Sequence, residues 1–578
     1  MAEDPNQITY FAQTNSRGKE LPFGIKRKDR ARHLYVIGKT GMGKSTLLEN
    51  MAIQDIRNGE GIAFIDPHGS TADRIMEYVP KERVKDVVYF APFDMEYPVA
   101  FNVMEDVGYD KRHLVVSGLL SAFRKIWVDA WSARMEYILS NTLLALLEYE
   151  GATLLDVNRM LINKTFRKKV VENVKDPIVK AFWVEEFANY TDRYTQDATP
   201  AIQNKVGQFT SNPLIRNIVG QPKSSFDIRR MMDEKKILIM NLSKGRVGEV
   251  NATLLGSMLV TKIYLAAMSR ADVPAEQMQK LPNFYFYVDE FQNFANESFS
   301  DILSEARKYK LNLIIAHQYV EQMEEEVRDA VFGNVGTTVA FRVGPFDAET
   351  LETIFAPQFE ATDLVNLGFA QIYLTLMIDG VGSPPFSATT MAPFDPPPSR
   401  HVDEVLAASR AAYGKSRVEV EKVIDEWQKV DAPEPPKPKK PATTYAKPPV
   451  APPVVPVSVP PVVTPMVKKE EEPMPPPQPQ HIRPVPPHAV PKPYVPPVAP
   501  KPPLEGPKSL KEALARITHA PKSAPPLPDR QAGAGGQAPA SSPLKDALRS
   551  VAPPPKKQEV PAEVLRDMLR VDEPDETH

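Results

Sequence analysis

The chain has 578 residues, a mass of 64.5 kDa and a formal net charge of −3. This length is enough for two or three domains, and the small net charge excludes a global basic field, so any nucleic-acid contact must come from local patches. The sequence contains no cysteine, which excludes disulfide bonds and thiolate metal sites. The polar N-terminus does not resemble a signal peptide, and no run of apolar residues is long enough to predict a transmembrane segment, because residues 252–268 are interrupted by polar side chains and predict a buried helix.

The first 32 residues are polar and end in a basic cluster. The cluster consists of Lys26, Arg27, Lys28, Arg30 and Arg32. Two interpretations are open: a solvated or subunit-facing edge, or a surface that contacts a DNA backbone.

A glycine-rich sequence follows the first predicted core strand, residues 33–37. The pattern G-x-x-x-x-G-K-[ST] is matched by Gly38, Lys39, Thr40, Gly41, Met42, Gly43, Lys44, Ser45 and Thr46. Leu48, Met51 and Ile56 then recur at helical spacing. In a strand–loop–helix of this kind, backbone N–H groups and the helix dipole receive phosphate oxygens. We expect Lys44 to reach the β- and γ-phosphates of ATP and the Ser45 hydroxyl to bind Mg²⁺.

The second predicted strand, residues 61–65, ends in a tight turn with the sequence Asp66-Pro67-His68-Gly69. Ligands bind at the carboxyl ends of strands in open α/β sheets. Asp66 either faces the Mg²⁺ site or, with His68, stabilises the turn. A third strand is predicted at residues 86–90.

Helical periodicity dominates residues 111–229. Apolar and aromatic residues such as Leu143, Trp183 and Phe187 recur at helical spacing. This pattern predicts an all-helical domain inserted into the nucleotide-binding sheet, with the aromatic residues in its core. The chain returns to the sheet at residues 236–241.

The segment 284–288 consists of five strand-forming residues and is followed by Asp289 and Glu290. An apolar strand that ends in two acidic residues is the Walker B pattern. We expect Asp289 to hold Mg²⁺ and Glu290 to act as the general base for the attacking water. The two motifs together predict ATP hydrolysis, and the sequence has no Asn-Lys-x-Asp motif for guanine.

A helix at residues 300–308 and a strand at 311–316 follow. The strand ends in His317 and Gln318, and Gln318 either senses the γ-phosphate or caps the strand. Arg307 lies on the preceding helix, where a solvated helix-end arginine is the alternative to a catalytic role. Further strands at 339–342 and 371–376 complete an α/β fold with a mostly parallel sheet and helices on both faces.

Most of the 60 prolines lie after residue 400, and this density predicts a disordered tail. The tail contains three leucine-rich motifs, residues 509–514, 543–548 and 564–569. They are either docking sites for protein partners or parts of a tail without partners. The predicted domains are an N-terminal segment 1–32, an ATPase domain 33–110 and 230–398, an all-helical insertion 111–229, a helical extension 399–429 and a tail 430–578.

The motifs resemble those of the FtsK/HerA superfamily of ring-forming DNA motors, whose core is RecA-like. Their order is most similar to that of the TraD/TraG-type coupling ATPases of type IV secretion systems over about residues 20–395. The order is G-K-T-G-M-G-K-S-T, I-D-P-H-G, a helical insertion, Y-V-D-E-F-Q-N, A-R-K-Y-K-L and A-H-Q. The resemblance implies that Arg307 enters the neighbouring subunit's site, that Gln318 is the sensor and that the insertion faces the DNA-entry side of a hexamer. Arg342 is a second arginine candidate. Two departures are the lack of N-terminal transmembrane helices and the lack of an N-terminal barrel.

From these features we expect a homo-hexameric ATPase that uses ATP and Mg²⁺ to move DNA by backbone contacts without sequence specificity. We expect a cytoplasmic protein, or one at the periphery of a membrane secretion channel, with partner proteins on its tail. Two alternatives remain. One is an ATP-dependent scaffold that recruits partners through the tail, and the other is a secretion motor for protein substrates.

Overall fold

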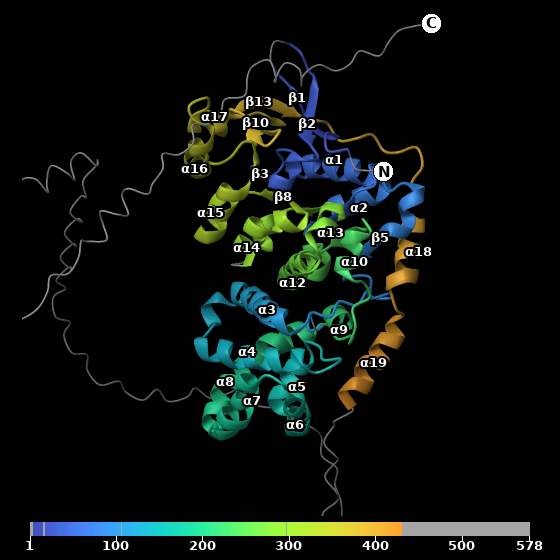
Figure 1. The fold of residues 1–578 in the computed structure, drawn as a ribbon, viewed down its shortest axis with the longest axis vertical. Helices are drawn as coiled ribbons and strands as arrows, with labels where there is room; N and C mark the ends of the chain where they lie inside the picture. The colour runs from blue at the N-terminus through green and yellow to red at the C-terminus, as the bar shows by residue number, and fades with distance from the viewer. Residues whose placement is uncertain (1–3, 16–17, 106, 296–297, 430–578) are drawn as a thin grey trace, which may run out of the picture. The chain divides into compact units, whose positions relative to one another are not determined.

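The structure is a computed structural model that describes residues 4–15, 18–105, 107–295 and 298–429 (Figure 1). All of these residues belong to one compact unit. The predicted tail, with its three leucine-rich motifs, lies outside the described residues.

Strands of the described residues form one large twisted sheet. Their bounds are β1 (Ile8–Thr14), β2 (Pro22–Lys26), β3 (Leu34–Ile37), β4 (Gly61–Asp66), β5 (Val87–Phe90), β6 (Ile237–Asn241), β7 (Phe284–Val288), β8 (Leu311–His317), β9 (Thr337–Ala340), β10 (Gln371–Thr375) and β13 (Phe386–Thr390). The spatial order is β2-β1-β13-β10-β9-β3-β8-β7-β4-β6-β5. The strands from β9 to β5 are parallel, and those from β9 to β2 pair in antiparallel fashion. β11 (Met377–Ile378) and β12 (Val381–Gly382) form a separate small hairpin. The predicted α/β fold with a mostly parallel sheet is confirmed.

The central strands are buried on both faces, which explains their continuous apolar sequences. In β3, Tyr35 and Ile37 point into one hydrophobic core, whereas Leu34 and Val36 point into another. α1 (Lys44–Arg57), α2 (Ser70–Glu77) and α18 (Val402–Tyr413) contribute to the second core. The first core is closed by α10 (Ile228–Asp233), α12 (Glu249–Met268), α14 (Ser298–Glu305), α15 (Glu325–Asn334), α16 (Pro345–Phe355) and α17 (Ala361–Asn366). Two short helices, α11 (Lys244–Val247) and α13 (Ala275–Lys280), flank α12 in the chain.

Among the described residues, seven α-helices lie between β5 and α10 in the chain. They are α3 (Arg112–Ile126), α4 (Ala133–Leu147), α5 (Asp156–Ile162), α6 (Lys164–Asn173), α7 (Pro177–Ala181), α8 (Asp192–Thr210) and α9 (Pro213–Val219). Polar caps fix several starts: the Ser132 side chain accepts from the Met135 N–H, and the Asn163 side chain accepts from Thr165 and Phe166. Trp183 and Phe187 are buried in the core of this segment, as the sequence predicted.

Short turns of 3₁₀ helix or, in η5, π helix connect the main elements. They are η1 (Asp29–Arg32), η2 (Lys81–Asp86), η3 (Tyr109–Lys111), η4 (Val128–Ala130), η5 (Phe182–Glu186), η6 (Phe187–Asn189), η7 (Ser269–Asp272), η8 (Phe291–Asn293), η9 (Ala306–Tyr309) and η10 (Val320–Gln322). η8 follows Glu290 and η9 contains Arg307, which are two of the predicted site residues.

The most apolar helix is α12, which was predicted as a buried helix. Together with η7 it spans Glu249–Asp272, has a mean hydropathy of 1.4, and meets the length and composition needed to cross a membrane; 72% of its apolar window is buried inside the protein. It packs against α3, where Gly118 leaves so little room that a Cβ atom would lie 2.4 Å from Cγ2 of Thr261. The buried-helix prediction is confirmed.

The structure differs from the sequence interpretation at both ends of the described chain. Two strands, β1 and β2, precede β3 and extend the sheet. The predicted helical extension consists of two helices, α18 and α19 (Arg417–Lys429). The helical conformation is interrupted at Gly414, which forms an isolated antiparallel β-bridge with Val99. In Figure 1, α18 lies beside β5 and α19 beside α9.

Candidate active site

The glycine-rich loop joins β3 to α1 at the carboxyl edge of the parallel strands. Gly41 has φ of +77°, a conformation that favours glycine, and a Cβ atom on Gly38 would lie 2.5 Å from Cβ of Phe341. The Lys44 side chain is buried and its Nζ donates to the carbonyl oxygens of Gly38 at 2.7 Å and Lys39 at 3.3 Å. Burial lowers the pKa of Lys44, whereas the nearby carboxylates of Glu290 and Asp289 raise it. The loop therefore curls around a lysine ammonium at the start of a helix.

Asp289 contacts the start of α1, the helix that follows the glycine-rich loop. It follows β7, and its Oδ2 accepts a hydrogen bond of 2.8 Å from the Ser45 hydroxyl. The carboxyl group is 1% exposed, and burial raises its pKa to about 6, although the Ser45 hydrogen bond opposes the shift. The structure thus brings the two predicted metal-binding residues together.

Glu290 is held by amide donors on both oxygens. Its backbone lies in the left-handed region, with φ of 49°. Oε1 accepts from Gln318 Nε2, and Oε2 accepts from Gln292 Nε2 at 2.7 Å. Burial by itself would raise the pKa of Glu290, but the approach of His68 and these two amides outweighs it and lowers the pKa to about 2. Strained backbone at such a residue is typical of functional sites.

Gln318 follows the last residue of β8, and its side chain points at Glu290. Two neighbours of Glu290 were not among the predicted site residues. Gln292 donates to it from η8, and Nε2 of the exposed His68 lies 3.9 Å from its Oε1. Their motifs, F-Q-N after Walker B and D-P-H-G after β4, are the sequence signals that pointed to this region.

Asp66 stabilises its own turn. Its Oδ1 accepts from the His68 N–H at 2.7 Å and its Oδ2 from the Ala72 N–H at 2.9 Å. Both oxygens are therefore used by the turn that starts α2, and of the two interpretations the structure favours this one.

Arg307 lies away from the site of its own subunit. It is exposed on η9, which precedes β8, whereas Gln318 follows β8. A strand of this length spans about 20 Å, so Arg307 and Gln318 lie at opposite ends of β8. Arg342 lies nearer: its guanidinium is 3.1 Å from Sδ of Met42, and its carbonyl accepts from the Lys39 N–H at 2.8 Å.

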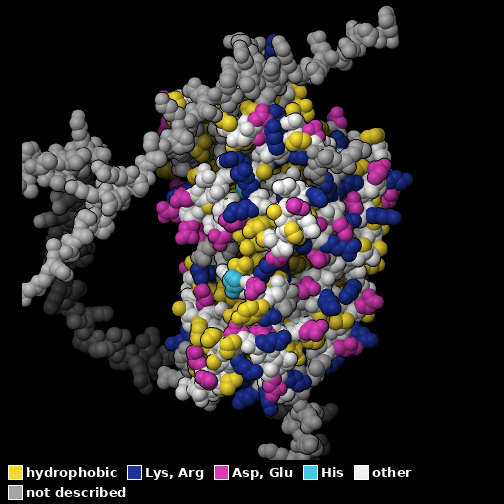
Figure 2. All heavy atoms as spheres, viewed as in Figure 1, with side chains coloured by type: hydrophobic (Ala, Val, Ile, Leu, Met, Phe, Trp, Pro, Cys, Tyr) yellow, Lys and Arg dark blue, Asp and Glu magenta, His cyan; other side chains and the backbone are white. Residues whose placement is uncertain are grey.

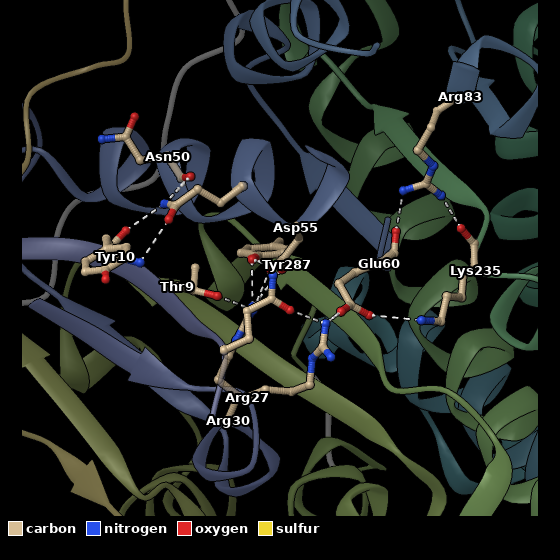
Figure 3. Close-up of polar contacts among 12 residues, drawn as sticks. Thr9, Tyr10, Arg27, Arg30, Asn50, Asp55, Glu60, Arg83, Lys235 and Tyr287 are labelled. Carbon is tan, nitrogen blue, oxygen red and sulfur yellow. Dashed lines mark hydrogen bonds and ion pairs between the residues drawn. The ribbon is translucent and has the colours of Figure 1, made fainter. Parts of the chain in front are cut away.

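A buried polar network joins the N-terminal segment to α1, the helix after the glycine-rich loop, and to β7, the strand before Asp289 (Figure 3). Arg30 is 4% exposed and donates to Oδ1 and Oδ2 of Asp55 on α1 at 2.5 and 2.8 Å, and to the Tyr287 hydroxyl on β7 at 2.8 Å. Arg27 pairs with the buried Glu60. Arg27 and Arg30 are both neutralised by carboxylates inside the subunit. Both interpretations of the basic cluster, a solvated or subunit-facing edge and a DNA contact, are therefore wrong for these two residues.

The donor set fits a nucleotide with Mg²⁺. A serine hydroxyl and a carboxylate converge at 2.8 Å, and these are ligands that Mg²⁺ accepts alongside phosphate oxygens and water. Within the described residues, no cluster of three or more histidine, aspartate or glutamate side chains is arranged to hold a metal by itself. The phosphates would therefore have to complete the coordination, as in other P-loop sites.

Comparison with known families identifies the chain's class. The model of the type IV secretion-system coupling protein DNA-binding domain matches residues 19–355, more than half of the 578 residues. No curated protein sequence matches the chain.

Several solved structures have a similar fold. The plasmid coupling protein TrwB in complex with the non-hydrolysable GTP analogue GDPNP has a TM-score of 0.50 and 14% identity, and the match covers 68% of this chain and 92% of that one. TrwB in complex with ADP and Mg²⁺ has a TM-score of 0.49 and 15% identity, with 68% and 99% covered. VirB4 of Thermoanaerobacter pseudethanolicus has a TM-score of 0.48 and 12% identity, with 68% and 98% covered.

Proposed function

The chain belongs to the family of the type IV secretion-system coupling protein DNA-binding domain, and we propose that it is an ATPase of the coupling-protein type that moves DNA as a hexameric ring. The observation that carries the ATPase assignment is the hydrogen bond of 2.8 Å between Ser45 and Asp289, with Glu290 held beside it by Gln318. A serine from one motif and two acids from another meet as Mg²⁺-dependent hydrolysis requires.

Each residue has a separate task in this proposal. The N–H groups of residues 38–46 and the Lys44 ammonium bind the phosphates. Ser45 and Asp289 would hold Mg²⁺, which would supply positive charge to neutralise the phosphates. The Glu290 carboxylate orients the attacking water and accepts its proton. Gln318, which touches Glu290, senses whether the γ-phosphate is present.

In the proposed ring, Arg307 has a catalytic role. This exposed arginine lies at the amino ends of the parallel strands, opposite the site of its own chain, so any part that it takes in catalysis would be in a neighbouring subunit. An arginine supplied in this way stabilises the charge of the transition state. In the proposal the core of residues 33–110 and 230–398 is the motor, and the helical insertion of residues 111–229 lies at the DNA-entry side.

Backbone contacts are the proposed mode of DNA binding. On the face shown in Figure 2, basic and acidic side chains are interspersed, and the net charge of the chain is −3. DNA is therefore expected to be gripped by local basic groups inside the ring, without base readout and with an affinity that falls as salt rises. In this account the protein works at the periphery of a secretion channel, and its tail recruits protein partners.

The test is the rate of ATP hydrolysis without a polymer, with single-stranded DNA, with duplex DNA and with an unfolded protein. The proposal predicts stimulation by at least one form of DNA and none by unfolded protein. Stimulation by unfolded protein alone would indicate a protein-secretion motor. Hydrolysis indifferent to every polymer, combined with nucleotide-dependent capture of partners by the tail, would indicate a scaffold.

A further inference from the structure

The loop that follows Glu290 connects the proposed active site to the helical insertion. It comprises η8 and the next two residues, Phe294 and Ala295, and is called here the post-Glu290 loop (residues 291–295). Its backbone is closed by hydrogen bonds from the N–H of Asn293 to Glu290 O and from the N–H groups of Phe294 and Ala295 to Phe291 O. Gln292, the donor to Glu290, is part of this loop.

One lysine of the insertion binds the loop from outside. Lys125, near the end of α3, donates from Nζ to the carbonyl oxygen of Gln292 at 2.6 Å and also to that of Ala295. One ammonium group therefore joins both ends of the loop. Lys125 is half-buried, and burial lowers its pKa to about 8 against an opposing effect of Glu324.

The loop is fixed between two helices. Phe294 packs on α12 where Gly256 leaves room, since a Cβ atom there would lie 2.3 Å from the Phe294 ring. α3 is itself packed closely on α12 through Gly118 and Thr261. A displacement of the end of α3 can therefore reach the loop directly through Lys125, in addition to the packing through α12.

We propose that Lys125 is a positioning residue through which the helical insertion sets the placement of Gln292 on Glu290. The path runs from the Lys125 ammonium to the Gln292 carbonyl, from the Gln292 amide to Glu290 Oε2, and so to the group that orients the attacking water. Lys125 contacts neither the glycine-rich loop nor Asp289 in any described hydrogen bond. Its loss should therefore change turnover and leave nucleotide binding intact. The kinetic part of this inference rests on the proposed ATPase activity.

Two kinds of measurement test the inference. In the full-length protein, Lys125→Met removes the donor and keeps the apolar stem, so kcat for ATP should fall about tenfold while KM changes less than about twofold. Lys125→Arg keeps a cation that can donate to two carbonyls and should restore most of kcat. Gln292→Ala should lower kcat similarly, and the double variant should be little worse than either single one.

The second measurement does not depend on hydrolysis. Hydrogen–deuterium exchange of peptides covering residues 290–295 should be faster in Lys125→Met than in the wild type and near wild type in Lys125→Arg. Lys262→Met is the matched control. Lys262 is also a half-buried lysine that donates to a carbonyl, that of Glu105 at 3.2 Å, and no described hydrogen bond joins it to the loop. The control should leave exchange of residues 290–295 unchanged.

The outcomes separate this inference from the proposed function. Unchanged exchange in Lys125→Met, or equal changes in Lys262→Met, would overturn the role of Lys125 whatever the ATPase assay shows. Faster exchange together with a wild type that does not hydrolyse ATP would support the Lys125 link and contradict the proposed function. If Lys125→Met does not fold, Lys125→Gln and Gln292→Ala provide the same comparison of exchange and kcat.

Discussion

The Ser45 hydroxyl donates to Oδ2 of Asp289 at 2.8 Å although the two residues are 244 positions apart in the chain. The contact arises because β8 alone separates β3, which leads into Ser45, from β7, which leads into Asp289. Both strands run parallel, so their carboxyl ends meet at one edge of the sheet. The register of three strands thus builds the proposed metal site.

Asp289→Asn should weaken the binding of Mg²⁺ at the proposed site and thereby lower the rate of hydrolysis. The amide keeps the shape and can still meet Ser45, but it lacks the charge that a hard cation needs. Because removing a group that merely orients a metal ligand costs about 10–100-fold, we expect hydrolysis to fall by at least about 100-fold. Titration of Mg²⁺ against ATPase rate and against binding of a fluorescent nucleotide checks this. A normal Mg²⁺ dependence in the variant would place the metal elsewhere.

Arg307 is expected to act across a subunit boundary. Arg307→Ala should abolish most hydrolysis, since an arginine of this kind contributes roughly 10³–10⁵ in rate. Rings mixed from Arg307→Ala and Glu290→Gln subunits should regain activity, because some interfaces then combine an intact arginine with an intact base. Absence of rescue in rings shown to be mixed would place Arg307 outside the neighbouring site.

Arg30→Met should destabilise the protein strongly. It leaves Asp55 and the Tyr287 hydroxyl buried without their cation, and breaking a buried pair costs about 3–5 kcal/mol. Thermal or urea unfolding measures the loss. The matched control is Arg230→Met, whose pair with Glu234 has side chains 75% and 41% exposed and should contribute little to stability. Equal losses in the two variants would mean that the Arg30 network adds no special stability.

Acid should destabilise the fold through two buried histidines. Burial lowers the pKa of His33 to about 4 and that of His317 to about 3, so both are neutral in the folded protein. As the pH falls below the ordinary value of about 6.5, the unfolded chain binds protons that the folded chain does not, and stability is lost between about pH 6.5 and pH 4.

The unfolding temperature measured across this pH range checks the histidine prediction. In the wild type, the Leu313 N–H donates to His33 Nδ1 at 3.1 Å, and His33→Gln keeps an acceptor for this hydrogen bond. The unfolding temperature of His33→Gln should fall less on acidification than that of the wild type. His113→Gln, at an exposed position of α3, should not. Identical pH profiles for the wild type and His33→Gln would contradict the assignment.

Elements that depend on a short stretch of sequence could be predicted. A run of apolar residues that ends in polar residues, such as residues 284–290, predicts both a buried strand and the point at which the strand ends. β13 was missed because Phe386–Thr390 lies among prolines, which argue against a strand. β1 and β2 were missed because both strands are only partly buried and their apolar pattern is weak.

Contacts between residues that are far apart in the chain could not be predicted from the sequence. The basic cluster ending at Arg32 has the composition of a surface patch, and only the fold shows that Arg30 meets Asp55 and Tyr287. Likewise nothing in the spacing of Lys125 and Gln292 indicates that they touch. The Walker motifs could be found because their residues are adjacent in the chain. The residues that position them belong to elements brought together by tertiary packing.

The most direct test of the account is a comparison of the wild type with Glu290→Gln in ATP binding and hydrolysis. The amide preserves the size of the side chain and leaves Ser45 and Asp289 in place, but it cannot accept the proton of the attacking water. We predict that the variant binds ATP with Mg²⁺ as the wild type does, and that hydrolysis falls by about 10²–10⁴-fold so that intact ATP remains bound. Hydrolysis by Glu290→Gln at the wild-type rate would contradict the account.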